Sequence, residues 1–333
     1  MMQCQESNLP AKCHIKSLKR YVQKEYTKNK TQIKLRSKIA KIEDYIKQNE
    51  TIYPEYDFQL LQIQLAKSIH FIDQKTLYSP ESEVDVLINQ YIYPRIEDID
   101  EILHDILKSQ KPKLLNFTKL EIFIKEVINE LQPKNEEEYY IIRNSLLRIC
   151  FSQLHIISPN LLFDLDPISF SNSCNTVIKS TPKDLCLNER LFSIEMLDKT
   201  IIELTETNSH LKEATENLKL LNFYVNPPDI LNCVFSSLKC CEMFVHDNTY
   251  DEKKKKSKVQ SEMSFDDFFP LFLAIFAVNP PPNSLRIGWF FTAMYGIDMA
   301  IPFSFAKLIL TSAINTLKDF SLERFRMVSS DSF

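Results

Sequence analysis

The chain has 333 residues, of which 44% are hydrophobic and 25% are charged, and its net charge is −4. This length is enough for about two domains with a sizeable core, and the small net charge excludes a bulk electrostatic attraction to nucleic acid. Only two residues are glycine. Glycine-rich phosphate loops and dinucleotide fingerprints are therefore excluded, because each needs several glycines in a short window. A chain so poor in glycine favours helices over tight β-hairpins.

Cysteine and histidine form no metal-binding pattern in this sequence. The eight cysteines include no Cys-x-x-Cys pair, and the six histidines include no His-Glu-x-x-His motif. Zinc sites need such closely spaced ligands, so we predict no metal site and no cofactor. Most cysteines lie in apolar helical patterns, which favours buried free thiols in a reducing cytoplasm. The amino terminus is polar and has no apolar signal core.

The first half of the chain predicts a basic segment followed by helices. Residues 12–41 hold eleven Lys or Arg and one acidic residue, Glu25. This favours a solvated basic helix, with a contact to an anionic membrane as the alternative. Apolar residues at helical spacing then predict helices at 57–72, 82–93, 96–107, 118–131 and 135–157.

Two of these helices have recognisable starts. Thr118 with Glu121 has the spacing of a capping box. Asn135 stands before three glutamates, an arrangement that suits the positive end of a helix dipole.

The second half begins with a segment rich in Ser, Pro and Asn, residues 164–184, which we predict to be a loop at the domain boundary. Asp229 is the expected cap of an apolar helix over 230–245. Residues 246–262 are expected to be a charged loop that is solvated, or alternatively contacts a membrane or a GTPase. Further helices are predicted at 189–205 and 209–222.

The most hydrophobic region, residues 268–317, raises the alternative of a membrane hairpin. Its uninterrupted apolar run, Phe268–Val278, has 11 residues, whereas a membrane-spanning helix needs about 20. Prolines and charged residues interrupt the remainder. We therefore expect a cytoplasmic protein, with peripheral contact to endosomal membranes as the further option.

Several stretches of the second half resemble the vacuolar protein sorting nine (Vps-nine) domain. Residues 264–270 read Ser-Phe-Asp-Asp-Phe-Phe-Pro and are similar to the family's Ala-Asp-Asp-hydrophobic-hydrophobic-Pro helix start. An apolar helix and Asn279-Pro280-Pro281 follow, as in the family. Residues 303–308, Phe-Ser-Phe-Ala-Lys-Leu, stand where the family has Tyr-Tyr-Phe-Thr-Asn-Leu, and residues 214–233 resemble an earlier signature.

The resemblance implies a guanine-nucleotide exchange factor for Rab GTPases of the Rab-five class, which catalyses no covalent step. It assigns Asp266 as an aspartate finger that enters the nucleotide site and pairs with the phosphate-binding lysine of the GTPase. It also assigns GTPase contacts to Asp267, Pro270, Phe303, Ala306 and Lys307. Apart from the family, Asp266, Asp267 and Pro270 are also typical of a helix start, where acids cap free N–H groups.

Two departures from the family pattern affect the expected activity. Phe303 lacks the family's aromatic hydroxyl, and Ala306 lacks the hydrogen bond of the family's threonine, typically about 0.5–1.5 kcal/mol. The alternatives are therefore a GTPase-binding scaffold of the same fold without exchange activity, or an unrelated helical adaptor.

We predict an all-α fold built from two parts. Residues 1–160 would form a basic helix and a helical bundle, and residues 175–322 a packed helical exchange-factor domain. Residues 1–14 and 323–333 are expected to be frayed ends. The predicted partner is a Rab-five-like GTPase, and no nucleic-acid partner is expected.

Overall fold

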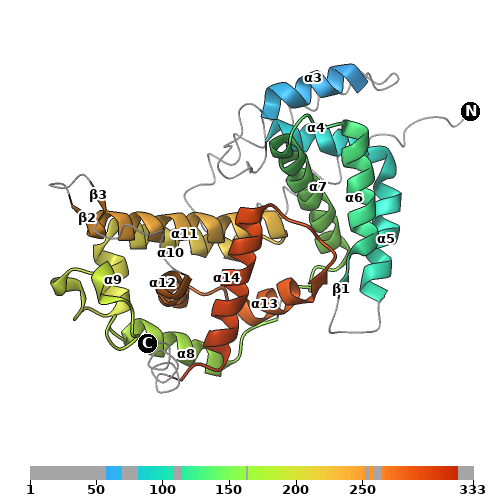
Figure 1. The fold of residues 1–333 in the computed structure, drawn as a ribbon. Coiled ribbons are helices and arrows are strands. Elements are labelled where there is room, and N and C mark those ends of the chain that lie inside the picture. Colours follow the sequence, from blue (N-terminus) through green and yellow to red (C-terminus); the bar gives the residue numbers. More distant parts are fainter. Residues whose placement is uncertain are drawn as a thin grey trace, which may run out of the picture. The chain divides into compact units, whose positions relative to one another are not determined.

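The computed structural model describes residues 58–69, 82–108, 115–162, 164–251, 256–257 and 265–321. The predicted basic segment at 12–41 and the tail at 323–333 lie outside these residues. The all-α prediction is confirmed, because helices dominate the described chain and each strand has two residues (Figure 1). No described helix is both long enough and apolar enough to cross a membrane.

The chain divides into two compact units. Unit 1 holds the described residues up to Pro159, together with the short segments Asn226–Pro228 and Gly296–Asp298. Unit 2 holds Asn160–Val225, Asp229–Tyr295 and the chain from Met299 onward. The polypeptide therefore enters unit 1 three separate times.

Unit 1 is built around its longest helix. That helix, α7, packs against α4, α5 and α6, while α3 packs against α4. As predicted, Asn135 caps α7, because its Oδ1 accepts a hydrogen bond from the Glu138 backbone N–H at 2.8 Å. The elements of unit 1 are α3 (Phe58–Ile69), α4 (Glu83–Ile92), the 3₁₀ turn η1 (Tyr93–Arg95), α5 (Ile96–Lys108), β1 (Leu115–Asn116), α6 (Thr118–Leu131) and α7 (Glu136–Ile157).

A buried arginine ties together separate parts of unit 1. Arg143 of α7 has 0% exposure, and its Nη2 forms an ion pair with Glu121 of α6. Its Nε and Nη2 also donate to the backbone carbonyl of Asp298, at 3.0 and 2.8 Å. Because a buried charge is tolerated only when paired and hydrogen-bonded, these contacts fix the Gly296–Asp298 segment within unit 1.

Unit 2 surrounds one apolar helix, α12. Its residues Leu271–Ala277 are all at most 2% exposed, and α12 packs against α8, α9, α10 and α14. Figure 1 shows α12 almost end-on, between α9 and α14. The helices of unit 2 are α8 (Ile168–Lys179), α9 (Ile201–Thr207), α10 (Ser209–Lys219), α11 (Pro227–Thr249), α12 (Phe265–Val278), α13 (Ser284–Ala293) and α14 (Ile301–Lys318).

Short elements connect these helices. The 3₁₀ turns are η2 (Glu189–Leu191), η3 (Ile194–Met196) and η4 (Leu220–Phe223), and the two-residue strand β4 covers Met294–Tyr295. Strands β2 (Tyr250–Asp251) and β3 (Lys256–Ser257) pair antiparallel, with Tyr250 opposite Ser257. The charged loop predicted at 246–262 begins later than expected, because α11 continues to Thr249.

Other local predictions are corrected by the structure. The predicted loop at 164–184 contains α8, because Phe170, Cys174 and Val177 fall on one helical face and are buried there. The predicted helix at 189–205 is instead two 3₁₀ turns followed by the short helix α9. The capping box at Thr118 is absent, since Glu121 is turned toward Arg143. Asp229 lies in the first turn of α11, which begins at Pro227.

Both glycines of the chain are at positions that exclude a side chain. A Cβ on Gly288 of α13 would lie 2.9 Å from Ile314 Cγ2, so α13 and α14 pack at a distance that only glycine permits. Gly296 has a φ of +85°, and a Cβ there would meet Thr118 Oγ1 at 3.0 Å. Each of the two glycines therefore stands at a position where a larger residue would clash with a neighbour.

Candidate functional site

The start of α12 carries the acidic pair singled out in the sequence. Asp266 and Asp267 are the second and third residues of this helix, where a carboxylate is favoured by the positive end of the helix dipole. The structure includes their backbone in α12, while their side chains lie outside the described residues. The acidic pair is therefore placed at one end of the most buried helix of unit 2.

Pro270 lies inside α12, later than the first-turn position predicted for it. A proline has no backbone N–H, so the carbonyl four residues earlier, that of Asp266, receives no helical hydrogen bond. Pro270 is only partly buried, as is Phe269. The first turn of α12 is thus less firmly bonded to the rest of the helix than the buried turns that follow.

Helix α14 presents an exposed apolar stripe, formed by Ile301, Phe305 and Leu308. These side chains are 79%, 39% and 53% exposed, respectively. Their spacing of four and three residues places them on one face of the helix. Exposed large apolar side chains that line up on one face typically mark a contact surface.

Two of the three predicted contacts on α14 point away from the stripe. Phe303 is 1% exposed and Ala306 is 0% exposed, so both pack in the core of unit 2. Phe305 and Leu308 are therefore exposed, whereas Phe303 and Ala306 support the helix from inside. The same burial accounts for apolar residues at both positions, because an unpaired hydroxyl there would be costly.

The acidic start of α12 and the α14 stripe lie next to each other in unit 2. The rings of Phe268 and Phe305 are stacked, with 6.4 Å between their centroids. Phe268 follows Asp267 directly, and Phe305 is the middle residue of the stripe. The contact between Phe268 and Phe305 therefore joins the first turn of α12 to the exposed stripe of α14.

Lys307 directly precedes Leu308 in α14 and is the last of the predicted contacts. Its side chain is partly buried, and that burial lowers the pKa of its ammonium. Among the described residues, no acidic side chain offsets this effect. The sequence marked Lys307 as a substitution for asparagine, while its partial burial is visible only in the structure.

The exposed apolar stripe on α14 was not predicted from the sequence. The signal was available, because Ile301, Phe305 and Leu308 repeat at helical spacing. However, α14 is apolar over most of its circumference, so the pattern does not tell which face is exposed.

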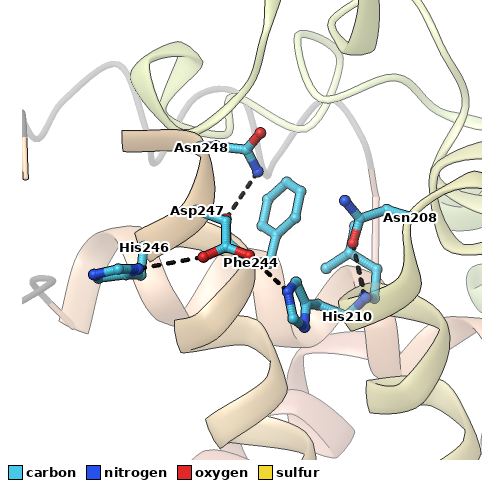
Figure 2. Close-up of polar contacts among 7 residues, drawn as sticks. Asn208, His210, Phe244, His246, Asp247 and Asn248 are labelled. Atoms are coloured by element: carbon cyan, nitrogen blue, oxygen red, sulfur yellow. Dashed lines mark hydrogen bonds and ion pairs between the residues drawn. The ribbon is translucent and has the colours of Figure 1, made fainter. Parts of the chain in front are cut away.

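Figure 2 shows a second polar cluster in unit 2, at the end of α11. The carboxylate of Asp247 lies 2.8 Å from His210 Nε2 and 3.3 Å from His246 Nδ1. Hydrogen bonds from His210, and then from His246, lower the pKa of Asp247. Asn208 caps α10 by accepting from the backbone N–H of His210 at 3.0 Å. The cluster joins the start of α10 to the end of α11.

The described residues were compared with the requirements of a metal site and of a ligand pocket. No group of three or more His, Cys, Asp or Glu side chains in this part of the chain is arranged to hold a metal ion. A cavity of about 150 Å³ in unit 2 is smaller than the roughly 300–1,000 Å³ typical of ligand pockets. Its lining comprises Leu162, Asp164, Leu165, Leu221, Asn222, Tyr224, Val225, Pro282, Asn283 and Ile287.

The described cysteines have a structural role. Five of them, Cys150, Cys174, Cys233, Cys240 and Cys241, are buried and free, as predicted, while Cys186 is exposed. Burial raises the pKa of the Cys150 thiol to about 12. A thiol of this kind is not ionised at neutral pH and is a poor nucleophile.

Comparison with family models finds no match for this chain, and comparison with curated proteins finds none either. The resemblance to the Vps-nine domain family therefore rests on the motifs at 214–233, 264–270 and 303–308.

Proposed function

We propose that this protein is a guanine-nucleotide exchange factor for a Rab-five-type GTPase, acting in vesicular trafficking. The observation that carries the proposal is the stacking of Phe268 on Phe305, with 6.4 Å between the ring centroids. This contact brings the acidic start of α12 beside the apolar stripe of α14. An exchange factor needs both features on one surface: an apolar area that binds the GTPase and a carboxylate that reaches the nucleotide.

Asp266 supplies the carboxylate in this proposal. A bound nucleotide places its phosphates against a lysine and a magnesium ion of the GTPase. A carboxylate that takes the place of the phosphate keeps that lysine paired and repels the remaining phosphate oxygens. The exchange factor thereby binds the nucleotide-free GTPase more tightly than the loaded form, and this difference in affinity promotes release.

The position of Pro270 supports this role. Because Pro270 cannot donate to the Asp266 carbonyl, the turn that carries Asp266 is held by fewer helical hydrogen bonds. That turn can then adjust to a partner at lower cost than the buried turns of α12. The apolar stripe supplies contact area next to it.

Nucleotide release from a panel of Rab GTPases tests the proposal, using the full chain. We expect faster release of a fluorescent GDP analogue from a Rab-five-type GTPase. Asp266→Ala should reduce the acceleration roughly a hundredfold, because it leaves the GTPase lysine without a partner. Glu195→Ala removes an exposed carboxylate of η3 that has no assigned contact, and this control should retain the activity. Absence of acceleration with every GTPase, or full activity of Asp266→Ala, would contradict this role.

A second function, a GTPase-binding scaffold without exchange activity, is favoured by Phe303 and Ala306. The family has a tyrosine and a threonine at these positions, and here both side chains are apolar and buried. Such a protein would bind the nucleotide-free GTPase without changing the release rate. Measuring binding and release on the same preparation separates the two functions. A peripheral contact with endosomal membranes fits either one.

A further inference from the structure

The cavity of unit 2 lies between the segment that precedes α8, the turn η4 and the start of α13, and it has a volume of about 150 Å³. Three apolar residues of its lining, Leu162, Leu221 and Ile287, are at most 5% exposed. Two others, Asp164 and Leu165, are exposed, Leu165 by 80%. The cavity therefore has a buried apolar interior and an accessible mouth.

The size of the cavity suits one compact apolar group. Apolar cavities of about 150 Å³ stay dry and bind molecules of the size of benzene, whereas drug-sized ligands occupy pockets of roughly 300 Å³ or more. A single ring that enters the cavity removes its own apolar surface from water, which favours binding. Tyr224 belongs to the lining, and its ring offers an aromatic surface for such a group. The lining therefore favours one aromatic ring as the occupant.

Hydrogen bonds fix the segment before α8 against the start of α13. The Asp166 carboxylate accepts from the backbone N–H groups of Ser284 and Leu285, at 2.8 and 2.9 Å. The side-chain amide of Asn283 donates to the Leu162 carbonyl at 2.5 Å. Asn283 is the N-cap of α13 and makes no side-chain capping bond, so Asp166 takes over that role. Because both walls are held in place, a ligand meets a cavity that is already formed, and this lowers the cost of binding.

Asp164 gives the mouth of the cavity a negative charge. Among the described lining residues it is the one whose side chain is charged at neutral pH, and it is exposed. A cation at the mouth is attracted by this carboxylate and an anion is repelled. Exposed ion pairs contribute little free energy, so the apolar interior supplies most of the affinity and the charge selects among ligands.

We propose that this cavity is a binding site for a single-ring aromatic amine. The ring enters the apolar interior, and the ammonium group stays at the mouth beside Asp164. This inference does not depend on the proposed exchange activity, because none of the residues assigned to GTPase contact belongs to the lining.

Three probes with the same ring and different charge test the site on the full chain: phenethylamine, phenethyl alcohol and phenylacetate. Each is titrated by ligand-observed NMR. We expect phenethylamine to bind with a Kd of roughly 1 mM or tighter. Its affinity should exceed that of phenethyl alcohol about two- to fivefold, as for an exposed ion pair. Phenylacetate should bind most weakly, because its carboxylate meets that of Asp164.

Two variants locate the binding. Val225 is a partly buried residue of the lining, and Val225→Phe fills the cavity with a ring of the protein's own. We expect it to weaken all three probes at least roughly tenfold. Asp164→Lys reverses the charge at the mouth and should make phenylacetate the tightest of the three, with phenethyl alcohol unchanged. Glu195→Lys makes the same charge change on the exposed turn η3 and should keep the wild-type order.

Thermal unfolding of each variant shows whether it folds, and the remaining outcomes are decisive. Binding of phenethylamine weaker than about 10 mM overturns the inference. Equal binding to the wild type and to folded Val225→Phe also overturns it, because the probe then binds elsewhere. If Val225→Phe does not fold, Asp164→Lys decides, since its exposed position leaves the core intact. An unchanged order of the three probes in that variant would refute the assignment.

Discussion

The aromatic ring of Phe268 in α12 stacks on that of Phe305 in α14, at 6.4 Å between centroids. Phe268 is 9% exposed and Phe305 is 39% exposed, so the pair spans the boundary between the core and the surface of unit 2. Through this pair, the acidic start of one helix is held beside the exposed stripe of another.

The stripe should be needed for partner binding and not for stability. Leu308→Asp places a charge on its exposed face, where a docked apolar surface would have to desolvate it. We expect a loss of GTPase binding of at least roughly tenfold, measured by titration, with little change in Tm. Ile194→Asp is the control, because Ile194 is 85% exposed and lies in η3, away from α14 in the sequence. Equal effects of both variants would refute a specific role for the stripe.

Gly288 should be indispensable for the packing of α13 on α14. A Cβ there would lie 2.9 Å from Ile314 Cγ2, on a β-branched side chain that cannot easily move away. We expect Gly288→Ala to lower the free energy of unfolding by about 1–3 kcal/mol despite its better helix propensity. In an Ile314→Ala background the same change should be neutral or stabilising. Urea denaturation of the four proteins of this double-mutant cycle measures the coupling.

Arg143 should contribute strongly to the stability of unit 1. Arg143→Met leaves the Asp298 carbonyl without its side-chain donor and the buried Glu121 carboxylate with Lys125 as its remaining ion-pair partner, which we expect to cost about 3–5 kcal/mol. The double variant Arg143→Met with Glu121→Met should recover part of this loss, because it also removes the carboxylate that has lost its buried partner. Lys119→Met, which removes an exposed pair with Asp105, should stay close to wild-type stability in the same denaturation experiment.

The Asp247 cluster predicts a defined dependence of stability on pH. Because the pKa of Asp247 is lowered in the folded state, the ionised carboxylate stabilises the fold at pH values above its ordinary pKa of 3.8. That contribution disappears as the pH falls through the lowered value. Asp247→Asn should therefore be less stable than the wild type at pH 6, and the difference should vanish at the acid end. Glu206→Gln, on the exposed side of α9, is the control, and urea titrations at each pH provide the measurement.

Much of the fold could be predicted from the sequence where apolar spacing was clear. The faces of α5, α6 and α7 follow directly from residues such as Ile99, Leu103 and Ile106, which are buried as their spacing predicts. Helix α8 was missed because it is rich in Ser and Asn, which have low helix propensity. Burial of Phe170 and Val177 in the folded protein outweighs this low propensity. Glu121 was misassigned because a capping role and a buried ion pair require the same residue type.

The candidate site could be predicted only in part. The acidic start of α12 and the proline after it were visible as a motif. The orientation of α14 could not be predicted, because the helix carries apolar residues around most of its circumference. Its packing against α12 and α13 decides that Phe303 is buried and Phe305 is exposed. The partial burial of Lys307 follows from the same packing and has no counterpart in local sequence.

The segments Asn226–Pro228 and Gly296–Asp298 have a practical consequence for dissecting this protein. Both belong to unit 1 although they lie in the second half of the chain. A fragment beginning at Asn160 would retain these two tripeptides but lose helices α3 to α7 of unit 1, and with α7 it would lose Arg143, the donor to the Asp298 carbonyl. We expect such a fragment to be less stable and more prone to aggregate than the intact polypeptide. Inactivity of that fragment would therefore report on damage from the cut and not on which half of the protein recognises a partner.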